Sequence, residues 1–411
     1  MSWFADPGKG NSYIAYCGGG GKARTGVNNY IVILEDDYGP HKISTGDIVG
    51  VAIHIYQNPK TGKVWMVVAL DDKIHRYRMP SGELDGVLDV EQLCSSVTVN
   101  AMADILAVGC EDGPVKIYSI SDQAFAADGL VDVLTTHKKA VCAMAFSLRN
   151  GRLITSAKDG TACIYQNGRL ISGFKCSVQD DQAPPALQRR QTQVLVRGCA
   201  FADMDGKVAI TVASPRRGRA FLARWAEPPA GGGFKCVDRT PCSKTPVSAM
   251  SLSQDASLLT LGSTDGSVTF WSVEQWKPLK IFSEVHHLPV TCIAARPYPV
   301  PLQGEENGVE IHARSASADS QLACLTMQRR APKSTVPGAG GGTGFSLLST
   351  MTFVNRILYV VILAWLLSPI VQEAKVKCGS TAGGLGPWRR CIMDEVIIAP
   401  HGRVGVDKMP Y

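Results

Sequence analysis

The chain has 411 residues, of which 45% are hydrophobic and 19% charged, and its formal net charge is +6. Its 41 glycines and 23 prolines favour many short strands joined by turns over a helical bundle. The mild charge and the absence of aromatic residues between the basic pairs argue against a nucleic-acid partner, so none is expected. These pairs, which we interpret as solvated loop charges, are Lys138/Lys139, Arg189/Arg190 and Arg216/Arg217.

The first predicted element is a hairpin from Tyr13 to Leu34, and no cleaved secretory signal is expected before it, since the first residues lack a basic region and a long apolar run. Its two apolar strands flank the loop Cys17-Gly-Gly-Gly-Gly-Lys-Ala-Arg-Thr-Gly-Val-Asn-Asn29. Four consecutive glycines exceed what a hairpin needs and allow the backbone to present carbonyls or amides to an ion or a partner. The alternative is a loop that is only flexible.

This loop is not a phosphate-binding P-loop. Gly21-Lys22 is followed by Ala23 rather than Ser or Thr, and Tyr16 stands in place of the first glycine. A dinucleotide-binding fingerprint also fails, because no further glycine follows at the required spacing.

The rest of the N-terminal 330 residues contains repeats. An apolar strand, a step of small residues, an Asp-Gly turn and an alternating strand that ends in an aromatic residue recur at 106–118, 153–165 and 258–271. Asp-Gly between alternating strands is a strong hairpin signal, and we expect each hairpin to form the third and fourth strands of a propeller blade. Weaker copies lie at 64–77, 208–221 and 313–324, and first strands are predicted at 141–146, 247–252 and 290–295. With the hairpin at 13–34, the repeats predict an all-β, seven-bladed propeller of degenerate WD-repeat type.

Cysteine and histidine patterns give no sign of a metal centre or of an enzyme. None of the thirteen cysteines forms a CxxC pair with zinc-ligand spacing, and Cys110, Cys142, Cys163 and Cys292 fall inside apolar strand patterns. These are expected to be small buried hydrophobes in a reducing compartment. The pair His286-His287 is interpreted as part of a connection between blades rather than a metal site.

The C-terminal part is expected to anchor the propeller, which occupies 1–330, to a membrane. A Gly/Pro-rich linker at 331–350 precedes an apolar segment at 351–371 that is long enough for one transmembrane helix, and a tail follows at 372–411. The alternative for the apolar segment is a helix packed on the propeller. Because a large domain is made before the hydrophobic segment, the propeller is expected in the cytosol and the tail in the lumen. There Cys378 and Cys391 either pair or remain thiols.

The glycine loop, the predicted blades and the C-terminal anchor together resemble one family. This is the family of ER-resident exchange factors of the COPII coat, the Sec-twelve or prolactin regulatory element-binding protein family. Arg24 and Val27 differ from the residue types usual in the family. The positions that carry the resemblance are Gly18, Gly19, Gly20, Gly21, Arg24, Gly26, Val27 and Asn29.

The resemblance implies a function and a site. It implies that the loop is ordered by a potassium ion, whose ligands within Gly18 to Asn29 it does not assign. It also implies that the loop engages a Sar-type small GTPase at the ER membrane and releases GDP, with Asn29 as the main catalytic side chain. The partner-binding residues would be Gly18, Gly19, Gly20, Gly21, Arg24, Thr25, Gly26, Val27 and Asn28. Such a protein needs no acid, base or nucleophile, and the alternative is a membrane-tethered WD-repeat scaffold without exchange activity.

Overall fold

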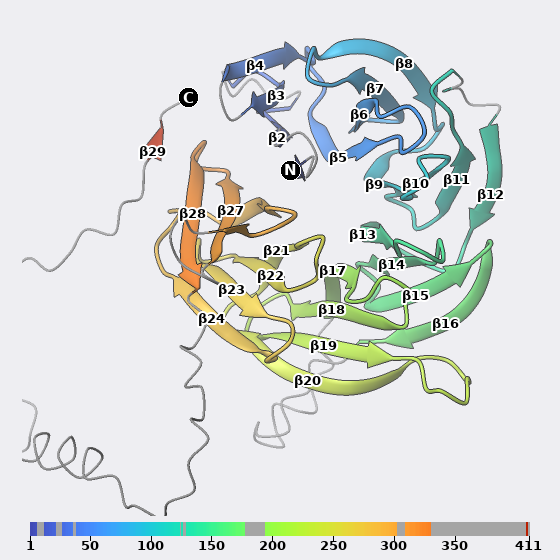
Figure 1. Ribbon diagram of the computed structural model, residues 1–411, viewed down its shortest axis with the longest axis vertical. Coiled ribbons are helices and arrows are strands. Elements are labelled where there is room, and N and C mark those ends of the chain that lie inside the picture. The colour runs from blue at the N-terminus through green and yellow to red at the C-terminus, as the bar shows by residue number, and fades with distance from the viewer. Residues whose placement is uncertain are drawn as a thin grey trace, which may run out of the picture. The chain divides into compact units, whose positions relative to one another are not determined.

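The computed structural model of the chain describes residues 1–5, 12–21, 27–35, 38–123, 125, 129–176, 194–301, 309–329 and 408–409. The strands in these ranges form seven antiparallel sheets, which Figure 1 shows arranged in a ring. The predicted all-β, seven-bladed propeller is therefore confirmed. Each sheet is one blade, numbered here in chain order.

The strands of each blade follow one another along the chain. Blades 1 to 4 consist of β1 (Ser2–Ala5), β2 (Ser12–Gly18), β3 (Tyr30–Glu35) and β4 (Tyr38–Ser44); β5 (Gly50–Gln57), β6 (Val64–Leu70), β7 (Lys73–Arg78) and β8 (Glu83–Asp89); β9 (Cys94–Val99), β10 (Ile105–Cys110), β11 (Val115–Ser119) and β12 (Leu130–Leu134); and β13 (Val141–Phe146), β14 (Leu153–Ala157), β15 (Thr161–Gln166) and β16 (Arg169–Lys175). Blades 5 to 7 consist of β17 (Val194–Phe201), β18 (Val208–Pro215), β19 (Ala220–Ala226) and β20 (Lys235–Ser243); β21 (Val247–Leu252), β22 (Leu258–Ser263), β23 (Val268–Ser272) and β24 (Lys277–Phe282); and β25 (Val290–Ala295), β26 (Val300–Pro301), β27 (Val309–Ser317) and β28 (Leu322–Arg329), beside which β29 (Lys408–Met409) pairs.

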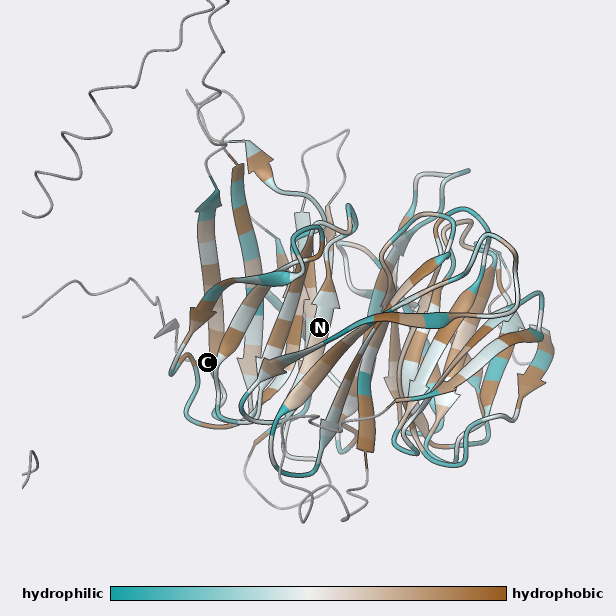
Figure 2. Cartoon of the chain, turned by 90° about the horizontal axis from the view of Figure 1, so that it is seen from below, coloured by the Kyte–Doolittle hydropathy of each residue, from teal (hydrophilic) through white to brown (hydrophobic). Residues whose placement is uncertain are grey.

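The core lies between neighbouring blades. The first strands pack against one another around the ring, as β5 does with β9 and β13 with β17, so they line the centre. Apolar side chains of the second and third strands fill the spaces between sheets; Trp65 of blade 2 and Leu106 of blade 3, for example, share one buried cluster. Figure 2 shows apolar residues along the strands and hydrophilic ones in many connecting loops.

The position of the Asp-Gly hairpins within the blades corrects the prediction. All three hairpins form, but they join the second strand to the third rather than the third to the fourth. In blade 3, Leu106 of β10 pairs with Tyr118 of β11, while β9 lies on the other side of β10. Turn chemistry is local, so it identifies a hairpin without indicating which of its strands lies nearer the centre.

Buried histidines tie the connections between blades to the hairpin turns. His137 precedes β13, and its two ring nitrogens lie 2.7 Å and 2.9 Å from the hydroxyls of Thr155 and Thr161. Nδ1 also lies 3.6 Å from the carboxylate of Asp159. Burial lowers the pKa of His137 below its ordinary value. His286, before β25, lies 2.9 Å from the hydroxyl of Ser315 in the same way.

The cysteines within the described strands are free thiols, and Cys110 and Cys163 are buried as expected. Cys142 and Cys292, which lie in the inner strands β13 and β25, are only partly buried.

Part of the predicted C-terminal organisation lies outside the described residues. The linker at 331–350, the predicted transmembrane helix at 351–371, and Cys378 and Cys391 belong to this part. Within the ranges that the structure describes, no helix is long and apolar enough to cross a membrane. Of the predicted tail at 372–411, only β29 is described, and it pairs with Leu322 and Ala323 of β28.

Candidate functional site

The glycine loop connects β2 to β3 in blade 1. The ladder between these strands ends at the pair Gly18 and Tyr30, and the chain beyond it leaves the sheet. Gly19 to Gly21 and Val27 to Asn29 are described on the two sides of the loop. The loop residues 22–26, which include the predicted site residues Arg24, Thr25 and Gly26, lie outside the described residues.

Asn29 holds the described parts of the loop together. Its side chain is 3% exposed. Oδ1 accepts a hydrogen bond from the backbone N–H of Gly21 at 2.9 Å, and Nδ2 donates to the carbonyl of Gly46 at 2.8 Å and, at 3.4 Å, to that of Gly21. Gly46 belongs to the connection between blades 1 and 2. The amide therefore links the glycine loop to the start of the next blade.

The close approach of the backbone to Asn29 explains why position 19, one of the four consecutive glycines, has no side chain. A Cβ at Gly19 would lie 2.1 Å from Asn29 Oδ1 and 2.6 Å from Asn29 Cα. Real Cβ contacts are not this short, so a side chain at position 19 would displace the amide. The N–H of Gly20 then bonds the carbonyl of Val27 at 3.2 Å and continues the contact between the two sides of the loop.

Two other predicted site residues face outward. The side chain of Val27 is 50% exposed, although it is apolar, and Asn28 is exposed and donates a hydrogen bond to the hydroxyl of Tyr30 at 3.2 Å. Both residues line a cavity of about 690 Å³ beside the loop. Residues of blade 7, among them Thr291 and Gln321, line the same cavity.

The chemistry of the loop fits a monovalent cation better than a divalent one. The sequence from Gly18 to Asn29 contains no carboxylate, whereas glycines allow backbone carbonyl oxygens, the ligands that replace the hydration shell of potassium, to converge. Elsewhere in the described part of the chain, no three His, Cys, Asp or Glu side chains gather in an arrangement that could hold a metal ion.

A neutral thiol lies under the loop. Cys17 is in close contact with Gly50, where a Cβ would lie 2.6 Å from Cys17 Cβ. Burial raises the pKa of Cys17 to about 11, so this thiol is protonated at neutral pH and is a poor nucleophile.

The sequence identified the loop but not the groups that position it. The structure brings together Gly18, Gly19, Gly20, Gly21, Val27, Asn28 and Asn29. It adds the Gly46 carbonyl and the Tyr30 hydroxyl, which no sequence signal marks: the first is a backbone group in another segment, and the second belongs to an ordinary strand residue.

Comparison with known proteins supports the propeller repeats. A family model described as WD domain, G-beta repeat, matches residues 129–166 and 234–272, well under half of the chain. Each matched segment runs from the outer strand of one blade through the first three strands of the next.

One similar curated protein is the retinoblastoma-binding protein 5 homolog of Drosophila melanogaster, which is 27% identical over 153 residues. The match covers 33% of this chain and 30% of that protein, so the chain spans less than a third of the relative's length. The seven sheets thus form a β-propeller, and two of its segments match WD repeats.

Proposed function

We propose that the propeller is a guanine nucleotide exchange factor that acts on a Sar-type small GTPase at the ER membrane and so starts COPII coat assembly. One observation carries this proposal. Asn29 clamps a glycine-rich loop at the edge of a cavity, and Val27 and Asn28 project from the same loop into solvent. Such a loop is suited to binding a protein partner, and exchange itself requires no catalytic acid, base or nucleophile.

The physical basis is differential affinity. An exchange factor accelerates GDP release by binding the nucleotide-free GTPase more tightly than the GDP form. Ordering a loop of glycines costs conformational entropy, so the bonds of Asn29 lower that cost before the partner arrives. In this conformation Asn29 acts as a positioning residue, while the exposed side chains of Val27 and Asn28 would contact the GTPase. When bound, potassium would be held by backbone carbonyls of the Gly18 to Asn29 loop and would supply a positive charge there.

The proposed location follows from the predicted membrane segment at 351–371. A propeller held on the cytosolic side of the ER would raise the effective concentration of the exchange loop for a GTPase that works on the same membrane.

A GDP-release assay tests the proposal. The full-length chain in mild detergent is mixed with a Sar-type GTPase loaded with fluorescent GDP, in potassium or in sodium buffer. We expect faster release in potassium. Asn28→Ala and Val27→Ser should lower the rate at least tenfold without changing the urea unfolding midpoint, because both side chains are exposed.

The controls separate the loop from the rest of the surface. Val131→Ser removes an exposed valine from the outer strand β12 and should leave the rate unchanged. Asn29→Ala should lower both the rate and the free energy of unfolding. A rate equal to spontaneous release for the wild-type chain refutes the exchange function, and a full rate for Asn29→Ala refutes the role of that residue.

The second candidate is a membrane-tethered WD-repeat scaffold that gathers partners without exchange activity. The matched WD repeats favour it, since they are shared by propellers of many functions. It predicts binding partners but no acceleration of GDP release.

A further inference from the structure

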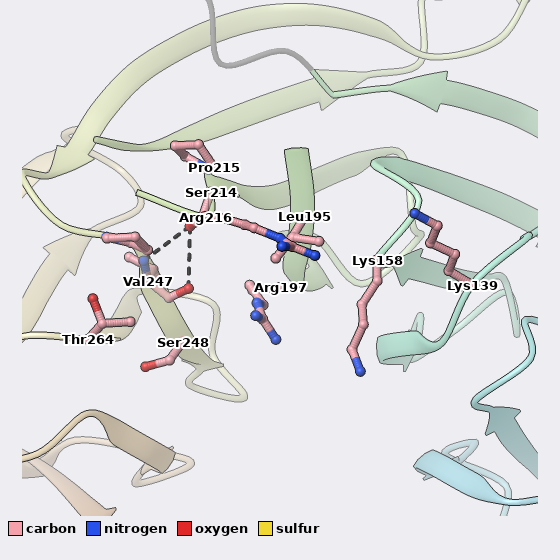
Figure 3. A pocket seen from close by; sticks show the side chains of 11 residues that line it. Lys139, Lys158, Leu195, Arg197, Ser214, Pro215, Arg216, Val247, Ser248 and Thr264 are labelled. Atoms are coloured by element: carbon pink, nitrogen blue, oxygen red, sulfur yellow. Dashed lines mark hydrogen bonds between the residues drawn. The ribbon is translucent and has the colours of Figure 1, made fainter. Parts of the chain in front are cut away.

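A second cavity, of about 470 Å³, lies between blades 4, 5 and 6. It opens on the propeller face that carries the glycine loop, because the turns between second and third strands and the connections between blades emerge together on that face. Four cationic side chains line it: Lys139, Lys158, Arg197 and Arg216. Figure 3 shows Arg197 and Lys158 pointing in the same direction, while Arg216 and Lys139 enter the space from opposite sides.

Arg197 occupies a position that recurs in the inner strands around the ring, but its residue type differs from that in the other blades. Near its start, each inner strand from β5 to β25 carries one residue that has no partner on the second strand, which is a β-bulge. In five blades this residue is small: Val51, Ser95, Cys142, Ser248 and Thr291. The hydroxyls of Ser95 and Ser248 bond the carbonyls of neighbouring strands. Blade 5 alone among these places a guanidinium here.

Lys158 and Arg216 also occupy a repeated position, the residue directly after the second strand. It is acidic in blades 2 and 3, basic in blades 4 and 5, and uncharged in blades 6 and 7. The residues are Asp71, Glu111, Lys158, Arg216, Thr264 and Ala318. At this position, acidic residues therefore lie on one part of the face and basic residues on another. The basic part coincides with the cavity.

Among the described residues of the lining, no carboxylate balances these four cations. The turn carboxylate of Asp159, which follows Lys158 in the chain, accepts hydrogen bonds from the N–H groups of Lys138 and Thr161 and from the Thr161 hydroxyl. Among the described residues, none of the four cations forms an ion pair. Because like charges gathered in a partly enclosed space repel one another, an anion that enters relieves this repulsion.

We propose that this cavity binds a compact anion with several phosphate groups, either a free polyphosphorylated molecule or the headgroup of a phosphorylated lipid. The volume matches sites for small molecules, and two guanidiniums offer the forked donors that phosphate oxygens accept in pairs. The site is separate from the glycine loop, and the proposal does not depend on exchange activity.

Calorimetric titration of the full-length chain with inorganic tripolyphosphate tests the site. We expect saturable binding that weakens as salt is raised from 50 to 300 mM. Arg197→Ser installs the residue found at the bulges of blades 3 and 6, so it should fold normally, and it should weaken binding at least tenfold. The matched control Arg217→Ser removes the same charge from the same turn as Arg216 but from a residue that does not line the cavity, and it should weaken binding less than twofold.

The outcomes are distinct. Absence of binding, equal losses in the two variants, or tighter binding of a glutamate-rich peptide of equal charge would overturn the proposal. A second arm uses phosphatidylcholine vesicles with and without phosphatidylinositol 4-phosphate. Recruitment that requires the phosphorylated lipid and is lost in Arg197→Ser assigns the ligand to a headgroup. Tripolyphosphate binding without such recruitment assigns it to a free anion.

Discussion

Asn29 organises the glycine loop through a single amide. Burial of an amide is costly unless its groups are bonded, and here both ends of the side chain have backbone partners. The position could be selected from the sequence, because the resemblance to exchange factors rests on it. Its burial could not be predicted, since its partner Gly46 is seventeen residues away in another connection.

A partly buried histidine on an inner strand gives a prediction about pH. Burial lowers the pKa of His54 in β5 from 6.5 to about 4. Between these values the unfolded chain binds a proton at this residue and the folded chain does not. Lowering the pH from 6.5 towards 4 therefore reduces the free energy of unfolding.

His54→Gln should flatten this dependence, because glutamine does not titrate. Urea unfolding at pH 7 and pH 5 should show a larger loss of stability for the wild type than for the variant. The buried His137 remains in both proteins and contributes equally to each. Identical losses would show that His54 titrates normally in the folded state.

The hairpin between second and third strands is the element that recurs in every blade. In blade 6 the turn glycine, Gly266, has φ +81°, and its carbonyl accepts the N–H of His286 from the connection to blade 7. The Asp-Gly signal predicted this hairpin because the turn conformation depends on the two turn residues themselves. Its place within the blade depends on contacts with distant strands, which the local sequence does not record.

Gly266→Ala should therefore be more damaging than an alanine at another left-handed glycine. A Cβ at Gly266 would lie 1.9 Å from the carbonyl oxygen of His286, whereas one at Gly62, with φ +70°, meets nothing within 4 Å. We expect Gly62→Ala to cost about 1 kcal/mol from backbone strain alone and Gly266→Ala about 3 kcal/mol or more. Chemical denaturation of both variants measures the difference, and equal costs would mean that the connection adjusts freely.

At the scale of the whole molecule, the ring closes where blade 1 meets blade 7. Trp3 of β1 takes part in this contact: its indole N–H donates to the hydroxyl of Ser12 at 2.7 Å within blade 1. The guanidiniums of Arg296 and Arg314, from blade 7, lie 6.0 Å and 5.9 Å from its ring. Cation–π contacts thus contribute to closing the ring.

Trp3→Ala should lower the free energy of unfolding by about 2 kcal/mol, and Trp3→Leu by about 1 kcal/mol, because leucine keeps part of the apolar contact. A double-mutant cycle with Arg314→Met should give a coupling of about 0.5 to 1 kcal/mol. Additive effects of the two substitutions would show that the cation–π contact does not stabilise the closure of the ring.

The number of blades could be predicted because each repeat carries its own turn and strand signals. The basic cavity could not. Lys139 and Arg216 were each interpreted as solvated loop charges, and they lie far apart in the chain. Only the closed ring shows that they share a lining with Lys158 and Arg197.

The way the ring closes also determines how it would respond to tension. All four strands of blade 1 come from the first 44 residues, and among the described strands none is shared between blades 1 and 7. A force that separates blade 1 from blade 7 would therefore load side-chain contacts across this seam rather than a ladder of backbone hydrogen bonds. The seam would open under a smaller force than the blades themselves, and the propeller would first yield as a broken ring of intact sheets.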